Sequence, residues 1–152
     1  INTEVIKDVN QIMKRTDTIA PTFSGSGIEI LRFVDSEEQQ TAGSFVRDTV
    51  KYMRFTNLCS TNFVSLYLIQ DSPEAQNPNT GNVGSGDESL FKLDAGKSMV
   101  FSNAQFQGTD YYDYVVEGYV DIQYFSSFAT LSSIKAKADT ASVQIEYFVA
   151  SS

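Results

Sequence analysis

The amino-acid sequence predicts an all-β protein: a single antiparallel β-sandwich, of the jelly-roll or immunoglobulin-like type, with a short N-terminal helix or arm. About eight apolar runs of strand length follow one another from Ile28 onward, and turn-forming residues stand between most of them. Strands at this density without intervening helices are typical of sandwiches and jelly rolls. A chain of 152 residues is long enough for one domain with its own core.

The first twenty residues differ from the rest of the chain. Their apolar residues recur at helical spacing, which predicts a short amphipathic helix or an arm that lies on a neighbouring molecule. The residues in this pattern are Val5, Ile6, Val9, Ile12 and Met13. All of them except Ile6 are candidate contacts with a partner. "APTFSGSG" then predicts a loop, so residues 1–27 are expected to form the arm or helix and residues 28–152 the sandwich.

The first predicted strands lie in the middle of the chain. "IEILRFV" (28–34) and "VKYMRFT" (50–56) are rich in β-branched and aromatic residues. "FVSLYLIQ" (63–70) is apolar on both faces, as is typical of a central strand. "SLFKL" (89–93) and "SMVFS" (98–102) flank the turn "DAGK", so they are expected to form a hairpin with Gly96 at positive φ.

The last predicted strands alternate apolar and polar residues. They are "GYVDIQYF" (118–125), "SIKAKA" (133–138) and "ASVQIEYFVA" (141–150). "KADTAS" is expected to join the last two as a hairpin turn. Residues 71–89 are rich in Pro, Asn, Gly and Ser, which predicts a long mobile loop.

The composition excludes several functions. With a net charge of −8, the surface repels phosphate backbones and anionic membranes, so neither nucleic acid nor membrane is expected as a partner. The chain contains no histidine, which removes the Ser-His-Asp and Cys-His arrangements and the commonest zinc ligand. The single cysteine, Cys59, lies in the turn-rich stretch "TNLCSTN" and is interpreted as a turn residue without chemistry. A lowered thiol pKa would need a positive neighbour, which the sequence does not impose.

Three weaker patterns remain open. Loop 71–89 offers Asp71, Glu74, Asp87 and Glu88 to calcium but lacks the spacing of a helix-flanked calcium loop, so no cofactor is expected. Asp110, Asp113 and Glu117 could supply paired carboxylates for glycoside hydrolysis, although such clusters arise by chance among 19 acidic residues. The candidate interface or ligand contacts in the same stretch are Tyr111, Tyr112 and Tyr114, which could instead fill a core.

The region from Val50 to Ala150 resembles the small β-sandwich structural proteins in virions of tailed bacteriophages. The resemblance is carried by "FTN" (55–57) before a second strand, by "KLDAGKS" (92–98), and by "IKAKADTASVQI" (134–145). It implies a non-enzymatic virion component located in the particle and assembled in the host cytoplasm. The implied role is a capsid decoration or cement protein, or else a tail or neck subunit.

The resemblance also implies partners, namely the major capsid or tail proteins and further copies of the chain itself. No catalytic residue carries over from this group. Two alternatives stay open: a carbohydrate-binding β-sandwich with Tyr111, Tyr112 or Tyr114 exposed beside Asp110 and Asn103, and an enzyme with two convergent carboxylates.

Overall fold

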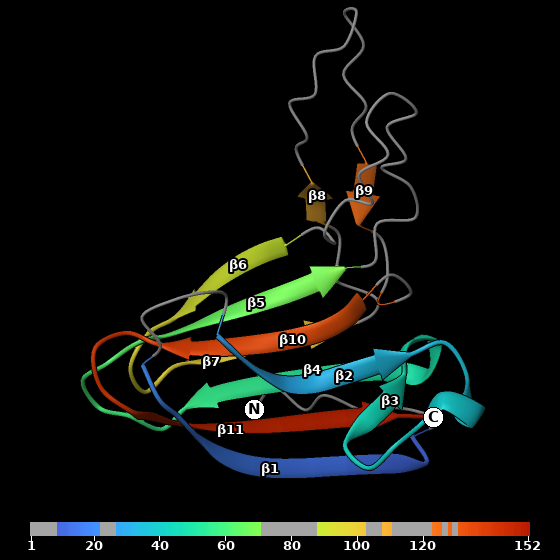
Figure 1. Ribbon diagram of the computed structural model, residues 1–152, viewed down its shortest axis with the longest axis horizontal. Coiled ribbons are helices and arrows are strands. Elements are labelled where there is room, and N and C mark those ends of the chain that lie inside the picture. The colour runs from blue at the N-terminus through green and yellow to red at the C-terminus, as the bar shows by residue number, and fades with distance from the viewer. Residues whose placement is uncertain are drawn as a thin grey trace, which may run out of the picture.

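The fold is known from a computed structural model, which describes residues 9–21, 27–70, 88–102, 108–110, 123–125, 128 and 131–152. These residues form eleven β-strands and two 3₁₀ helices, η1 (Glu37–Gln39) and η2 (Arg47–Thr49). The strands belong to two larger sheets and one two-stranded sheet (Figure 1). The prediction of an all-β protein is therefore confirmed.

Sheet A has four strands in the order β1-β11-β4-β7, and all its pairs are antiparallel. Its members are β1 (Gln11–Ile19), β11 (Val143–Ser151), β4 (Val50–Asn57) and β7 (Ser98–Ser102). β1 pairs with β11 over its whole length, from Gln11 opposite Ser151 to Ile19 opposite Val143. The first described strand is thus held by the last.

Sheet B has five strands in the order β3-β2-β10-β5-β6. Its members are β3 (Ser44–Val46), β2 (Ile28–Val34), β10 (Leu131–Ala138), β5 (Val64–Gln70) and β6 (Glu88–Leu93). The short β3 pairs with β2 in parallel, so the sheet is not antiparallel throughout as predicted. β8 (Gly108–Asp110) and β9 (Gln123–Phe125) form the small sheet.

The predicted helix at the N-terminus is wrong for Ile12 and Met13, because both residues lie in strand β1. On β1 the residues that share the inner face with the core of β11 are Met13, Arg15, Asp17 and Ile19. Inward-pointing charged side chains are common on edge strands. Here they stand where apolar residues would be expected, so the alternation typical of a strand is missing from the sequence. Val5 and Ile6 lie outside the described residues. For residues 1–8, the prediction of an arm or helix that precedes the sandwich remains a prediction.

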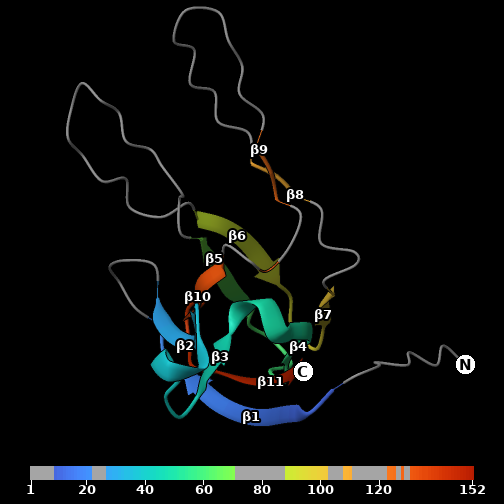
Figure 2. The same ribbon diagram turned by 90° about the vertical axis from the view of Figure 1, so that its right-hand side faces the viewer.

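The two sheets face each other across a common apolar core (Figure 2). In that view along the strands, sheet A runs from β1 at the bottom to β7 at the right, and sheet B from β2 at the left to β6 at the top. Aromatic rings join the layers. Phe91 of β6 and Phe101 of β7 meet edge to face with 5.4 Å between ring centroids, and Phe101 also contacts Phe55 of β4. Such pairs stabilise a core by about 0.5–1.5 kcal/mol beyond area burial.

Two predicted hairpins are wrong, because the paired runs belong to opposite sheets. The turn "DAGK" joins β6 of sheet B to β7 of sheet A, and "DTAS" joins β10 of sheet B to β11 of sheet A. Gly96 has the expected positive φ, at 68°. Two strands separated by a short turn look alike in sequence whether they pair with each other or belong to opposite sheets. Here each turn crosses, because both runs have an inner face that must be covered.

The turn 58–63 between β4 and β5 crosses the core in the same way, so three crossing turns lie together at one end of the molecule, on the left in Figure 1. The buried side chain of Asn57 joins two of these turns. Its Nδ2 donates to the carbonyls of Asn62 at 2.9 Å and Leu93 at 3.1 Å, and its Oδ1 accepts from the backbone N–H of Cys59. The Asn57 N–H donates to the carbonyl of Lys97. Buried backbone groups in the turns are thus satisfied by one side chain.

Candidate interaction surfaces

Sheet B presents an outer face that combines apolar side chains with charged ones of both signs. β5 places Val64, Leu66 and Leu68 in the core, where each is fully buried. Tyr67 and Ile69 alternate with them, so they lie on the outer face, where both are only half-buried. Figure 2 shows no described strand or helix over this side of sheet B.

Neighbouring strands extend this face by register. Tyr67 lies opposite Leu90 of β6 on one side and opposite Lys135 of β10 on the other. Residues directly opposite in an antiparallel pair share one face and touch. Leu90 is 61% exposed, which is unusual for a leucine in a strand. One row therefore runs Leu90, Tyr67, Lys135.

A second row lies beside it. Ser65 pairs with Lys92 of β6 and with Lys137 of β10. The ammonium of Lys92 lies 4.6 Å from the ring centroid of Phe63, which precedes β5, and 2.9 Å from the carboxylate of Asp94. Glu29 of β2 lies opposite Lys135, so the outer face of sheet B carries charges of both signs beside Tyr67 and Leu90.

The outer face of sheet A is organised around an aromatic ring. Phe148 meets Tyr52 edge to face at 5.9 Å, and the guanidinium of Arg54 lies over the Phe148 ring at 5.8 Å. Glu146 forms ion pairs with Lys14 at 3.0 Å and with Arg54 at 3.5 Å. One carboxylate on this face thus pairs with two cations.

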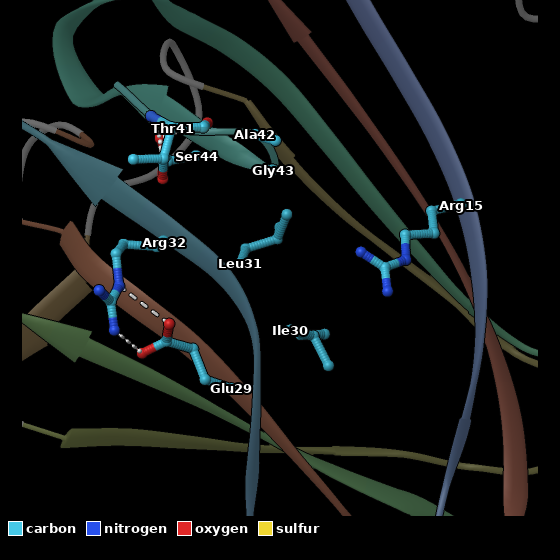
Figure 3. A pocket seen from close by; sticks show the side chains of 9 residues that line it. All are labelled: Arg15, Glu29, Ile30, Leu31, Arg32, Thr41, Ala42, Gly43 and Ser44. Atoms are coloured by element: carbon cyan, nitrogen blue, oxygen red, sulfur yellow. Dashed lines mark hydrogen bonds and ion pairs between the residues drawn. The ribbon is translucent and has the colours of Figure 1, made fainter. Parts of the chain in front are cut away.

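A polar hollow of about 230 Å³ lies between edge strand β1 and strands β2 and β3 (Figure 3). Two arginines from different sheets line it. Arg32 holds Glu29 through two hydrogen bonds, at 2.9 Å and 3.4 Å, and Arg15 donates to Asp17 at 3.0 Å. Each guanidinium therefore already has a carboxylate partner. Opposite Arg15, the turn from Thr41 closes the hollow, with Thr41 N–H donating to Ser44 Oγ at 2.7 Å.

Asp17 also connects the hollow to the core. The phenol of Tyr147, which is fully buried, donates a hydrogen bond to Asp17 Oδ2. Burial, and secondarily the bond to Asp17, raise the pKa of the Tyr147 phenol well above its usual value. This phenol therefore stays protonated in the folded protein and acts as a donor.

Cys59 lies in the turn between β4 and β5, as predicted, and is half-buried. Its pKa is nevertheless lowered to about 7, chiefly by hydrogen bonds from the backbone of Thr61 and then of Asn62 and from the Thr61 side chain. The Asn62 N–H lies 3.4 Å from Sγ. The expectation that only a positive neighbour could lower this pKa is wrong, because converging donors favour the thiolate in the same way. The turn-forming residues around Cys59 were the sequence signal that could have indicated its lowered pKa.

The structure places the residues that the sequence singled out as contacts only in part. Ile12 is 64% exposed at the edge of sheet A, whereas Met13 packs against the core and Val9 is half-buried. Val5 and the tyrosines at 111, 112 and 114 lie outside the described residues. The outer face of sheet B was missed as a candidate surface. Its signal was the two-sided apolar run at 63–70 next to "IKAKA".

The other chemical candidates also fall mostly outside the described residues. This applies to Asp71, Glu74, Asp87, Asp113 and Glu117, while Glu88 and Asp110 are described only as strand positions. Among the described residues, no three His, Cys, Asp or Glu side chains are grouped as metal ligands would be. In the same part of the chain, no helix is both long and apolar enough to cross a membrane.

Fold and surfaces together define an all-β protein with two packed sheets, whose outer faces and edge carry the candidate contacts. No protein-family model matches the sequence, and comparisons with curated proteins and with solved structures find no similar protein.

Proposed function

We propose that the chain is a non-enzymatic structural protein of a tailed-phage virion, with capsid decoration or cement as the role and a tail or neck subunit as the alternative. Its partners would be major capsid or tail proteins and further copies of itself, and its location would be the virion. The sequence resemblance over Val50–Ala150 supports this proposal. The order in which the strands pair is the structural observation that supports it.

We infer that the two sheets form a jelly roll rather than an immunoglobulin-like sandwich. Leaving aside the short β3, β8 and β9, the eight remaining strands pair first with last: β1 with β11, β2 with β10, β4 with β7, and β5 with β6. Such nested pairing follows from one long hairpin of eight strands rolled up on itself, and eight-stranded double-sheet jelly rolls are common in viral capsid domains. An immunoglobulin-like domain distributes its strands differently.

Quantitative mass spectrometry of gradient-purified particles tests the role. We would compare the copy number of this chain with that of the major shell protein in particles made from the genome that encodes it. Copies equal to the shell protein, or a simple fraction of it, would support decoration or cement. A few to a few dozen copies would support a tail or neck subunit. Absence from the particles would contradict the proposal.

Jelly rolls also occur in lectin domains, so absence from particles would turn attention to carbohydrate binding. In that case, saturable binding to immobilised glycans that is lost on Tyr112→Ala would support a sugar-binding module.

A further inference from the structure

β1 is a long strand at the edge of sheet A. It runs for nine residues, Gln11–Ile19, and pairs with β11 on one side. In the described part of the chain no strand lies beyond it in the sheet, and Figure 1 shows no labelled element below it. Alternate backbone N–H and C=O groups of β1 therefore point away from the sheet. Such a row of groups is a template for a further strand.

The charges of β1 restrict which strand can pair with it. Arg15 and Asp17 lie on its inner face, on either side of Thr16, and their side chains are 58% and 24% exposed. Arg15 donates to Asp17 through Nε at 3.0 Å, which leaves the Nη donors of the guanidinium for a second carboxylate. An apolar strand would desolvate both charges without giving them partners, so β1 disfavours it. A strand that fits has to bring an acidic residue to Arg15 and a basic one to Asp17.

A second copy of β1 meets this requirement when the two strands run antiparallel about a twofold axis at Thr16. Arg15 of each copy then lies opposite Asp17 of the other, so both charges gain a partner. The same register sets Met13 opposite Ile19 and the two threonines opposite each other. Like charges would lie directly opposite if the axis passed through Arg15 or Asp17 instead, which is destabilising. The sequence of β1 is thus complementary to itself in the register centred on Thr16.

We propose that two copies of this chain join edge to edge through β1 in this register, so that sheet A of one copy continues into sheet A of the other. The inference rests on the proposed function in so far as that function includes contacts between copies, and it names the surface that makes them. The contact is isologous, which closes the assembly at a dimer. A pair of edge strands buries little area, so the dimer should be weak in solution and be favoured where copies are held close together.

A cysteine at the twofold axis tests the register in purified protein. In a Cys59→Ala background, Thr16→Cys sets two thiols opposite each other with Cα atoms about 4.5–5.5 Å apart, a separation that a disulfide spans. Mild oxidation should therefore give a covalent dimer. Thr18→Cys is the matched control, because Thr18 is also exposed on the same face of β1. In this register its two copies lie about 14 Å apart along the strands and should not be linked. Equal linking of both variants, or no linking of Thr16→Cys, would overturn the register.

Charge reversal tests the contact without an added thiol. Arg15→Asp replaces both ion pairs of the dimer with like charges, so the dimer dissociation constant from sedimentation equilibrium should rise about tenfold or more. Arg32→Asp is the control and should stay within about twofold of wild type. Arg32 is exposed to a similar extent, 63% against 58% for Arg15, and it too is paired with a carboxylate on its own strand. Urea midpoints verify that both variants fold, and equal dissociation constants for the two would overturn the contact.

Failure of this contact is distinguishable from failure of the proposed function. Wild-type protein that stays monomeric at every concentration would overturn the β1 contact, whereas the copy number in purified particles decides the virion function. A dimer that Arg15→Asp leaves unchanged would mean that another surface joins the copies. Growth of wild type beyond a dimer into open chains would mean that β1 pairs with a different edge, such as β7, and would overturn the twofold arrangement.

Discussion

The side chain of Asn57, fully buried at the end of β4, donates a hydrogen bond of 3.1 Å to the backbone carbonyl of Leu93 at the end of β6 in the opposite sheet. The same amide group donates to Asn62 and its oxygen accepts from Cys59. One side chain therefore joins two of the turns that cross between the sheets. Asparagine suits this position because it offers donors and an acceptor on a short, neutral side chain.

Asn57→Ala should lower the free energy of unfolding by about 2–4 kcal/mol. The substitution leaves buried backbone groups of Asn62, Leu93 and Cys59 without their partner, and each such group costs about 1–3 kcal/mol when unsatisfied. Urea unfolding followed by circular dichroism measures the change. Asn10→Ala, at an exposed position before β1, is the control and should stay within about 0.5 kcal/mol of wild type. Equal midpoints for the two variants would contradict the role assigned to Asn57.

Alkylation of Cys59 should reach half of its maximal rate near pH 7 in the folded protein. The rate follows the thiolate fraction, and the backbone of Thr61 and Asn62 holds the pKa of this thiol below its usual value. In urea these hydrogen bonds are lost, so the midpoint should move to about 8.5. Because the folded-state pKa is the lower one, the thiolate favours the folded state above the unfolded pKa, and this contribution is lost as pH falls towards 7. A midpoint that is unchanged on unfolding would refute the lowered pKa.

Tyr147→Phe should lower stability at neutral pH by about 1–2 kcal/mol, because it removes the hydrogen bond to Asp17. The pKa of the Tyr147 phenol is raised in the folded protein, so its contribution is fully present below about pH 10, the usual tyrosine value, and is lost as pH rises further. Urea unfolding at pH 7 and pH 11 should therefore show a smaller loss of stability with pH in the variant than in wild type. Tyr67→Phe, a tyrosine on the outer face of sheet B, is the control. A wild-type protein as stable at pH 11 as at pH 7 would not fit.

Gly27→Ala should destabilise the protein more than Gly43→Ala. The two glycines have nearly the same φ, 86° and 85°, so the strain of a left-handed conformation, about 1–2 kcal/mol, is common to both. At Gly27 an added Cβ would also lie 2.3 Å from the carbonyl oxygen of Ala136, whereas at Gly43 nothing lies within 4 Å. Thermal unfolding of both variants measures the difference. Equal melting temperatures for the two variants would contradict a destabilising contact between the added Cβ and the carbonyl of Ala136.

The strands were predictable where β-branched, aromatic and other apolar residues recur at every second position or fill a short run between turns. "ASVQIEYFVA" became β11, with Val143, Ile145, Tyr147 and Val149 all fully buried, and "FVSLYLIQ" became β5. β1 was not predicted because Arg15 and Asp17 occupy inward positions, which removes the apolar alternation. β3 was not predicted because a strand of three residues is too short for a periodic signal. Of "GYVDIQYF", only Gln123–Phe125 lies within the described residues, as β9.

Only the separate components of the outer face of sheet B could be recognised in the sequence. The two-sided apolar run of β5, the lysines of "IKAKA" and the leucine at position 90 are all visible in the sequence, whereas the exposure of Leu90 is not. Their assembly into one face depends on the register that sets Tyr67 between Leu90 and Lys135. A shift of one residue would turn every one of these side chains to the opposite face.

The sequence alone determined the all-β class, the position of most strands and the turn at Gly96, because alternation and turn chemistry act between residues close along the chain. Only the tertiary structure decided which sheet each strand joins, that β1 is a strand, and which side chains meet on the outer face of sheet B. These features come from pairing between distant segments, such as Ile19 with Val143. A turn that crosses the core and a turn that closes a hairpin can have the same local sequence, and burial of both inner faces selects between them.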